Sequence, residues 1–248
     1  MSYLFLFSML LLAILVSSPA VKGKIGEGKV KYYLGKLSPD QYVVLHDVLI
    51  PSKNGKTTQI DHVVLSQAGI FVIETKNYQG WIYGSEKSKK WTQVIYKRKQ
   101  SFHNPLHQNY GHIKAIEQII GDQIKPPYYS IIAFDPKSTI KKMDVNSPRS
   151  FVIYSNQLVK LIEKHDETVL NRLQIKRISQ RLEASNIVEN GSSKAHIKQV
   201  RTDQQEKLMK VKAGVCPKCG NQLVTRNRKN GNGSFKGCSG FPKCRFIA

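Results

Sequence analysis

The sequence predicts an α/β protein in which helices flank a sheet, with a small cysteine-rich ribbon at the C-terminus and a membrane helix at the N-terminus. Three observations lead to this prediction. Short runs of β-branched residues alternate with segments of helical spacing, which is typical of α/β folds. All four cysteines lie between residues 216 and 244, and residues 1–21 contain no charged side chain.

The N-terminal segment 1–21 is just long enough to span a bilayer, which takes about 20 residues. Lys22, Lys24 and Lys29 follow it, and by the positive-inside rule these lysines keep the bulk of the chain in the cytoplasm. The segment therefore predicts a single-pass anchor in the cell membrane. The alternative is a signal peptide cleaved near Ala20, followed by secretion, although a signal peptide normally carries positive charge before its apolar run.

The next segments lead into a hairpin. Apolar residues at 30, 33, 34 and 37 predict a helix over 26–37. Glu27 would lie in the first turn of this helix, where a carboxylate also interacts favourably with the helix dipole. Residues 42–50 predict a strand, and the turn residues of 51–55 connect it to the hairpin.

The stretch 59–80 predicts a β-hairpin that carries charges where a buried strand should be apolar. Asp61 interrupts the first β-branched run, and Glu74 and Lys76 follow the second. Glu74 and Lys76 share one face, because side chains alternate along a strand. A two-residue turn would place Asp61 opposite Glu74, whereas a three-residue loop would place Asp61 on the other face of the hairpin.

Two carboxylates so close would repel each other unless a cation lay between them. Their oxygens, together with the backbone carbonyl of Thr75, suit Mg²⁺ or Mn²⁺. Lys76 could then orient an attacking water or stabilise charge on a phosphate, as in a metal-dependent phosphodiesterase. The alternative is a salt bridge between Glu74 and Lys76 at the edge of the sheet, with no catalytic role.

Downstream of the hairpin, a helix is expected over 105–120, with Asn104 as its N-cap and Pro105 in its first turn. This helix carries Gln108. Apolar periodicity predicts further strands over 81–84, 91–96, 128–134 and 151–154, and helices over 158–163 and 169–182.

Three histidines, His103, His107 and His112, lie near the start of the helix over 105–120. Their spacing crosses the helix start, and no cysteine or acidic partner accompanies them. We therefore interpret them as polar surface groups or substrate contacts rather than as a zinc site.

The chain is strongly basic, with 39 Lys and Arg against 17 Asp and Glu and a net charge of +22. This balance suits a polyanion, and we favour nucleic acid, DNA ahead of RNA, over the anionic membrane surface. Lys97, Arg98 and Lys99 form a basic cluster with Trp91 and Tyr96 close by in the sequence. The cluster could hold a phosphate backbone, or it could be a solvated loop.

The four cysteines, Cys216, Cys219, Cys238 and Cys244, form two knuckles around a glycine-rich segment. Four thiolates in this arrangement predict a tetrahedral Zn²⁺ site. Two disulfides are the alternative, and they would require an oxidising compartment.

Four stretches of the chain resemble the nuclease-related domain (NERD) branch of the PD-(D/E)xK nuclease superfamily: GEGKV at 26–30, QIDHVV at 59–64, GIFVIETKNYQGWI at 69–82 and NPLHQN at 104–109. The resemblance implies a restriction-endonuclease-like mixed sheet. It also implies that Glu27, Asp61 and Glu74 are metal ligands, that Lys76 is the catalytic lysine, and that Gln108 is a further polar group of the active site.

Residues 214–246 resemble the zinc-ribbon fingers of type IA topoisomerases, which implies binding of single-stranded DNA. Phe235, Phe241 and Phe246 could offer stacking faces, or they could pack the small core of the ribbon. Basic residues around them could contact phosphates: Arg226, Arg228, Lys229, Lys236, Lys243 and Arg245.

These observations divide the chain into an anchor or signal peptide at 1–21, a NERD nuclease-like domain at 22–155, a helical and basic linker region at 156–213 and the four-cysteine zinc ribbon at 214–248. The expected function is metal-dependent hydrolysis of phosphodiester bonds in DNA by a membrane-anchored protein. The rival is a catalytically silent protein that tethers nucleic acid to the membrane. The sequence leaves the oligomeric state open.

Overall fold

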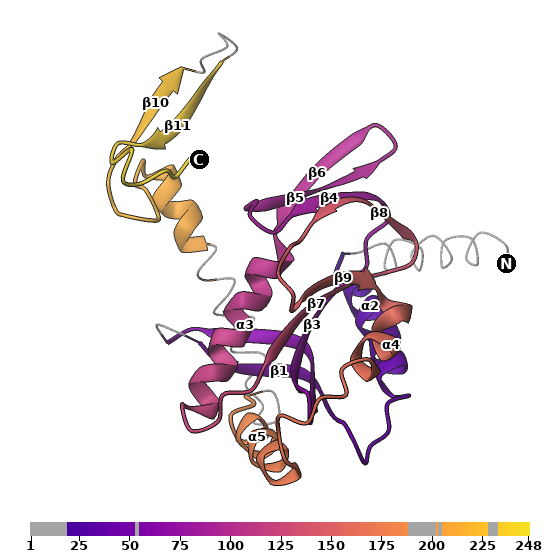
Figure 1. The fold of residues 1–248 in the computed structure, drawn as a ribbon. Helices are drawn as coiled ribbons and strands as arrows, with labels where there is room; N and C mark the ends of the chain where they lie inside the picture. The colour runs from indigo at the N-terminus through magenta and orange to yellow at the C-terminus, as the bar shows by residue number, and fades with distance from the viewer. Residues whose placement is uncertain (1–18, 53–54, 188–201, 203–204, 228–232) are drawn as a thin grey trace, which may run out of the picture. The chain divides into compact units, whose positions relative to one another are not determined.

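The computed structural model describes residues 19–52, 55–187, 202, 205–227 and 233–248, and it contains two compact units (Figure 1). The first unit extends from Met1 to Asn190 and the second from Gly191 to Ala248. The expected anchor, residues 1–21, lies outside the described residues except for its last three positions, which belong to helix α2.

The first unit is built on a five-stranded mixed sheet with strand order β1-β2-β3-β7-β9. Strand β2 is antiparallel to both of its neighbours, β1 and β3, whereas β3, β7 and β9 are parallel to one another. The bounds of the strands are Val43–Pro51 for β1, Thr57–Ser66 for β2, Gly69–Lys76 for β3, Tyr128–Phe134 for β7 and Ser150–Tyr154 for β9. The prediction of a mixed α/β sheet is therefore confirmed.

The hairpin of β2 and β3 uses the two-residue turn, because Ser66 pairs with Gly69. A Cβ on Gly69 would lie 2.4 Å from the carbonyl oxygen of Pro127, and its φ of +144° favours glycine. The pairing runs back to His62 opposite Ile73, so the next residues in the same register are Asp61 and Glu74. The turn thus decides between the two registers that the sequence allowed.

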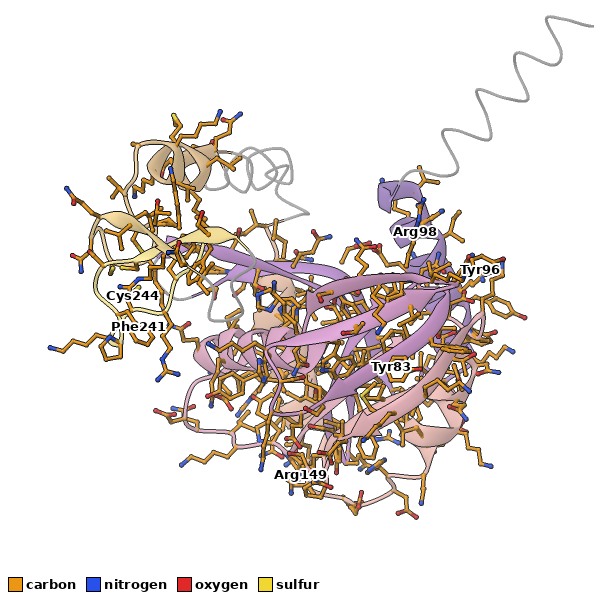
Figure 2. All side chains as sticks on the ribbon, turned by 90° about the horizontal axis from the view of Figure 1, so that it is seen from above. Tyr83, Tyr96, Arg98, Arg149, Phe241 and Cys244 are labelled. Carbon is orange, nitrogen blue, oxygen red and sulfur yellow. The ribbon has the colours of Figure 1, made fainter. Side chains whose placement is uncertain are left out.

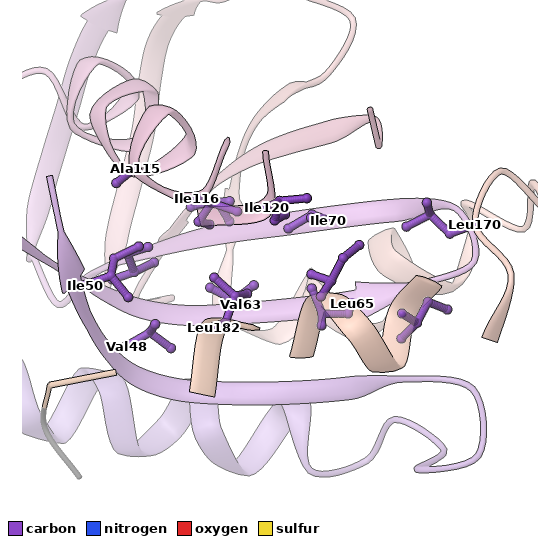
Figure 3. Close-up of a cluster of buried hydrophobic side chains, with 14 residues drawn as sticks. Val48, Ile50, Val63, Leu65, Ile70, Ala115, Ile116, Ile120, Leu170 and Leu182 are labelled. Atoms are coloured by element: carbon purple, nitrogen blue, oxygen red, sulfur yellow. The ribbon is translucent and has the colours of Figure 1, made fainter. Parts of the chain in front are cut away.

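Helices cover both faces of this sheet. On one face, α3 (Pro105–Ile120) and α5 (Arg172–Ala184) pack on alternate strand residues such as Ile70 and Val72 (Figure 3). On the other face, α2 (Pro19–Leu34) and α4 (Leu158–Glu163) pack on Phe71 and Ile73. This alternation follows from the period of two along β3, and it explains why that strand reads as a continuous apolar run.

A second, four-stranded sheet has the order β6-β5-β4-β8. Its strands are β4 (Gly80–Ser85), β5 (Lys90–Ile95), β6 (Arg98–His103) and β8 (Ser138–Asp144). One face buries Ile82 and Trp91 against Ile132 and Phe134 of the first sheet. The apolar pattern of the sequence predicts β4 and β5 but neither β6 nor β8, because β6 and β8 are polar and largely exposed.

Helix α3 has the predicted bounds, and the Asn104 side chain accepts a hydrogen bond from the backbone N–H of Leu106 at 2.9 Å. Two other helices begin elsewhere than predicted. Helix α2 begins at Pro19 rather than at residue 26, so Glu27 lies inside the helix and not in its first turn. Helix α5 begins at Arg172 after the N-cap Asn171, whose side chain accepts from the backbone N–H of Gln174.

Residues 156–187 contribute α4 and α5 to the core of the first unit, although they were grouped with the linker region on composition. The first unit therefore continues well past residue 155. In the part of the chain that the structure describes, no helix is both long and apolar enough to cross a membrane. The second unit contains the hairpin of β10 (Leu223–Asn227) and β11 (Ser234–Cys238).

Candidate active site and zinc centre

Asp61 and Glu74 meet where β2 and β3 stop pairing with each other. The carboxylate Oδ2 of Asp61 accepts a hydrogen bond from the backbone N–H of Thr75 at 2.7 Å, which ties the two strands together at this point. Glu74 is only 4% exposed. A carboxylate is rarely so buried without partners, so the contacts of Glu74 decide what this site can do.

Lys76 and Gln108 lie beside Glu74. The Nζ atom of Lys76 is 2.6 Å from Oε1 of Glu74 and 3.4 Å from Oε1 of Gln108, which projects from the first turn of α3. The shared face of Glu74 and Lys76 is thus confirmed. The structure brings together four predicted site residues from three elements: Asp61, Glu74, Lys76 and Gln108.

His112 also reaches this site, one turn of α3 beyond Gln108. Its Nε2 atom lies 3.4 Å from Oε2 of Glu74, and its Nδ1 atom lies 2.9 Å from Oγ1 of Thr58. The interpretation of His112 as a surface group is wrong, because the residue is only 3% exposed. The spacing of four between Gln108 and His112 was the available signal, since residues four apart share a helix face.

His103 and His107, in contrast, are exposed, as expected. Nε2 of His107 lies 3.0 Å from the carbonyl oxygen of Glu86, so this ring contacts the connection between β4 and β5. Neither residue belongs to a cluster of metal-ligating side chains among the described residues.

Glu27 is half-buried on α2, where the helix passes close to the end of β3. A Cβ on the neighbouring Gly26 would lie 2.7 Å from Cβ of Asn77, so only glycine allows this approach. The Asn77 side chain also donates a hydrogen bond to the carbonyl of Lys22 at 2.5 Å. These contacts bring Glu27 close enough to interact electrostatically with Asp61 and Glu74.

The carboxylates of the site influence one another's protonation. Burial, reinforced by the charge of Glu74, raises the pKa of Asp61 to about 8 even though Thr75 donates to the carboxylate. Burial together with Asp47 and Glu74 raises the pKa of Glu27. For Glu74, burial acts in the same direction, but the neighbouring His112 and Lys76 outweigh it and lower the pKa of this carboxyl.

Lys76 remains charged despite its surroundings. Burial alone would lower the pKa of an ammonium group, yet the carboxylate of Glu74 outweighs burial and raises the pKa of Lys76. At neutral pH the side chain therefore carries its proton and donates hydrogen bonds. It can stabilise negative charge but has no free electron pair with which to accept a proton.

The four cysteines form a second centre in the second unit. The ligand atoms of Cys216, Cys219, Cys238 and Cys244 all lie within 4.8 Å of one another. Sulfur atoms are 3.7 Å apart in the pair Cys216 and Cys244 and 3.3 Å apart in the pair Cys219 and Cys238. A disulfide requires about 2.05 Å, whereas four thiolates around one zinc lie at about this spacing, since each Zn–S bond is about 2.3 Å.

The phenylalanines of the ribbon divide between its core and its surface. Phe246 packs against the buried cysteines. Phe241 is 58% exposed, and the guanidinium carbon of Arg226 lies 5.6 Å from the centre of its ring. Together with Phe235 and Arg245 they line a hollow of about 490 Å³. Figure 2 shows Phe241 close to the zinc ligand Cys244.

Comparisons with known proteins agree with both centres. The model of the nuclease-related domain family matches residues 22–135, and the model of the topoisomerase DNA binding C4 zinc finger matches residues 213–248. Over 201 residues the chain is 44% identical to an uncharacterised protein of Bacillus anthracis. The aligned region covers 78% of this chain and 94% of that protein.

A shorter similarity concerns the ribbon alone. Over 31 residues the chain is 58% identical to DNA topoisomerase 1 of Mycoplasma genitalium. The aligned region covers 12% of this chain and 4% of the topoisomerase. No solved structure matches the chain significantly.

A mixed sheet whose central hairpin presents two carboxylates and a lysine, followed by a zinc ribbon, defines a nuclease-like protein that binds nucleic acid. The chain belongs to the nuclease-related domain family.

Proposed function

We propose that this protein hydrolyses phosphodiester bonds in DNA with the help of a divalent cation, Mg²⁺ or Mn²⁺. The observation that carries the proposal is the close arrangement of buried Glu74 with half-buried Asp61 and Lys76 at the point where β2 and β3 stop pairing. A salt bridge at a sheet edge, the alternative explanation of Glu74 and Lys76, would not need a second carboxylate beside it.

The donor set fits such a cation. Oε2 of Glu74 is buried and has no hydrogen-bond partner among the described residues, while Oε1 is engaged by Lys76. Asp61 presents a second carboxylate, and Glu27 a third within electrostatic range. Oxygen ligands of this kind are those that Mg²⁺ prefers. Glu27, Asp61 and Glu74 would hold the ion, and a bound cation would also remove the repulsion that raises the pKa of Asp61.

When bound, Mg²⁺ would supply a water of lowered pKa and would stabilise negative charge on the phosphate. Hydrolysis forms a bond from the water oxygen to phosphorus and breaks one phosphorus–oxygen ester bond, with the leaving oxygen taking up a proton. The ammonium of Lys76 is placed to donate hydrogen bonds to phosphate oxygens as their charge increases. Gln108 can orient the water or the scissile phosphate through its amide.

The zinc ribbon would hold nucleic acid for this site. Residues 190–248 contain 13 Lys and Arg and 2 Asp and Glu, so half of the net charge of +22 lies in this segment. Exposed Phe241, with Arg226 over its ring, offers a stacking face beside a cation. Single-stranded DNA is the ligand that this combination suits best.

Anchoring of the chain in the cell membrane by residues 1–21, with its bulk in the cytoplasm, is a further part of the proposal. It rests on the uncharged segment and on the lysines that follow it. Fractionation of cells that produce the full chain tests this part. Recovery with washed membranes at full length supports an anchor, while a shortened chain in the medium indicates a cleaved signal peptide.

The catalytic proposal is tested with the full chain, loaded with zinc, on labelled single-stranded and duplex DNA in Mg²⁺, in Mn²⁺ and without either ion. We expect metal-dependent cleavage that Asp61→Ala and Lys76→Ala reduce by about 100-fold or more. Asp122→Ala, which removes an exposed carboxylate in the α3–β7 connection, is the matched control and should cleave as the wild type does.

Binding of DNA without cleavage by a fully zinc-loaded chain would contradict the proposal. If that binding were unchanged by Asp61→Ala, the second candidate would hold, namely a catalytically silent protein that tethers nucleic acid to the membrane. The high positive charge of residues 190–248 favours this second candidate equally.

A further inference from the structure

The second sheet presents one face that the core does not cover. Ile82, Trp91 and Phe102 point inward, where they pack on the first sheet. Cross-strand partners share a face, and Trp81 pairs with Val94, which in turn pairs with Lys99. Because side chains alternate along each strand, these residues project away from the core. We call this side, with Trp81, Tyr83, Val94 and Lys99, the outer face of the second sheet.

Aromatic side chains are exposed on and beside the outer face. Trp81 is 47% exposed, and Tyr96, in the turn between β5 and β6, is 97% exposed. Figure 2 shows Tyr83 on this sheet, and Tyr96 with Arg98 at the end of the hairpin. Single exposed rings are normal on protein surfaces, whereas exposed rings gathered on one side of a sheet are a feature of binding sites.

The charge of this sheet is strongly positive. Residues 80–103 and 138–144 contain eight Lys and Arg against two acidic residues, Glu86 and Asp144. Glu86 accepts hydrogen bonds from the backbone N–H groups of Asn146 and Ser147, and its pKa is lowered, first of all by the hydroxyl of Ser147. It is therefore engaged at one end of the sheet. The cations suit a ligand that carries repeated negative charge.

Cations and rings occur side by side on the outer face. The register of β4 against β8 shifts between Ile82 and Tyr83, and the Nζ atom of Lys141 lies 5.0 Å from the centre of the Trp81 ring. Next to Trp81, a hollow of about 660 Å³ is lined by Gln79, Tyr96 and Lys137. This interleaving of rings and ammonium groups is the arrangement that binds bases by stacking and phosphates by charge.

A short connection joins the strand of the candidate active site to the second sheet. Only Asn77, Tyr78 and Gln79 separate Lys76 at the end of β3 from Gly80 at the start of β4. This connection is fixed, because Gly80 has a φ of +75° and a Cβ there would lie 2.3 Å from the carbonyl oxygen of Val94. Trp81 on the outer face thus follows Lys76 by five residues along the chain.

We propose that the outer face of the second sheet binds single-stranded nucleic acid. Bases stack on Trp81 and on the neighbouring tyrosines, while Lys99, Lys141 and Lys142 contact phosphates. The inference rests on the proposed function in so far as the same nucleic acid is the substrate of the hairpin site. It concerns binding, however, and it holds for an inactive protein as well.

Tryptophan fluorescence gives a local readout of this binding. The chain contains two tryptophans, and Trp91 is fully buried with its ring N–H donating to the carbonyl of Ser85. Stacking of a base can therefore quench only Trp81. We would titrate the full zinc-loaded Asp61→Ala chain, without Mg²⁺ or Mn²⁺, with oligodeoxythymidylate. The expected result is saturable quenching, with an affinity that falls as salt rises.

Variants test the residues. Trp81→Ala should lose the quenching and bind about tenfold more weakly, the effect of removing one stacking ring. Tyr110→Ala is the matched control, because Tyr110 is 63% exposed on α3 and has Lys114 5.6 Å from its ring centre, yet lies outside this sheet. It should behave as the parent does. Lys141→Gln should reduce the salt dependence of binding by about 0.7 in logarithmic slope.

Three outcomes would overturn the inference. The first is no quenching together with an unchanged affinity of Trp81→Ala. The second is equal weakening for duplex and single-stranded oligonucleotides, which would indicate phosphate contacts without stacking. The third is a loss confined to binding of phosphatidylglycerol vesicles, which would assign the face to a membrane surface. Because Asp61→Ala removes cleavage from the measurement, failure of the nuclease proposal and failure of this one are distinguishable.

Discussion

Glu74 is in contact with a positive or hydrogen-bonding group on each of its two oxygens. Lys76 holds Oε1 at 2.6 Å, and His112 lies 3.4 Å from Oε2 without the geometry of a good hydrogen bond. Thr58 contacts the other ring nitrogen of His112 at 2.9 Å and so restrains the imidazole. This chain from Thr58 through His112 to Glu74 makes His112 a positioning residue for the candidate metal ligand.

We predict that His112→Ala weakens binding of Mn²⁺ by about 10- to 100-fold, the usual effect of removing a group that orients a metal ligand. Isothermal titration of the zinc-loaded chain with Mn²⁺ measures this affinity without reference to cleavage. His107→Ala is the control, because His107 is exposed on the same helix and does not contact Glu74. Equal affinities of His112→Ala and the wild type would show that the imidazole does not position Glu74.

The docking of α2 on the end of β3 depends on the absence of a side chain at one glycine of the helix. Gly26 and Gly28 lie two residues apart on this helix. A Cβ added at Gly26 would lie 2.7 Å from Cβ of Asn77, whereas a Cβ added at Gly28 would have no neighbouring atom within 4 Å. The two glycines thus provide a matched pair. Gly26 is required for the close approach of α2 to Asn77, whereas Gly28 only raises the conformational entropy of the unfolded chain.

We predict that Gly26→Ala lowers the free energy of unfolding by about 1–3 kcal/mol, the usual cost of overpacking. Gly28→Ala should raise it by about 0.4–1 kcal/mol, because alanine restricts the unfolded chain and fits the helix. Urea unfolding of the two variants measures both values. The account of how Glu27 reaches the site would be wrong if both substitutions stabilised the protein.

At the scale of elements, an ion pair joins α2 to the turn between β7 and β8. Nζ of Lys29 is 2.6 Å from Oδ2 of Asp135, whose side chain is 3% exposed. Oδ1 of Asp135 accepts from the backbone N–H of Lys137 at 2.9 Å. Burial opposes the charge of Asp135, but Lys29 and this backbone N–H outweigh burial and lower the pKa of the carboxyl.

Because the pKa of Asp135 is lowered in the folded state, the unfolded state binds more protons at acidic pH. The stabilisation by Asp135 is therefore fully present above the ordinary pKa of 3.8, and it is lost as the pH falls through the lower pKa of the folded state. We predict that Asp135→Asn costs about 1–3 kcal/mol at pH 7 and less at pH 3, because the stabilisation declines once the pH is below 3.8. Urea unfolding of the variant and the wild type at both pH values measures the difference. Asp122→Asn is the exposed control, and a cost of Asp135→Asn independent of pH would contradict the ion-pair account.

The second sheet and the first sheet share the core around Trp91 and Phe134, whose rings stack at 6.3 Å between centres. The second sheet is therefore not an appendage. Its inner face completes the core, which frees its outer face and the turn at Tyr96 for contact with a ligand. The surface proposed above for single-stranded nucleic acid thus combines two strands that the sequence predicts, β4 and β5, with two that it does not reveal, β6 and β8.

At the scale of the whole molecule, the two compact units have different sources of stability. The first unit buries several clusters of apolar side chains on both faces of its sheet. In the second unit, the buried cluster among the described residues consists of three cysteines with Leu223 and Phe246 packed against it. A core of this size does not fold a ribbon by itself, so the ribbon depends on its zinc.

We predict that the chain binds one zinc and that its removal by a chelator unfolds the ribbon while the first unit keeps its melting temperature. Release of zinc to a colorimetric indicator gives the stoichiometry, and limited proteolysis of residues 214–248 follows the ribbon. Cys219→Ser should reproduce the effect of chelation. A shift in the melting of the first unit on chelation would show that the two units are energetically coupled.

The sequence by itself determined those features whose cause is local. The cap Asn104 and the period of α3 fix that helix, and the cysteine spacing identifies the ribbon. The alternation of charges around β2 and β3 also identified Asp61, Glu74 and Lys76 as a candidate site. Each of these signals lies within a few residues along the chain, where propensity and periodicity act.

Only the tertiary structure decided the features that arise between distant segments. Strands β6 and β8 are polar, so their pairing depends on neighbours rather than on their own apolar pattern. His112 is buried because α3 packs over β2 and β3, and α5 joins the core although its sequence is largely polar. Burial depends on how the whole chain packs. Contacts between distant segments therefore decide which polar side chain meets Glu74 and which face of the second sheet remains open, and no local pattern contains these contacts.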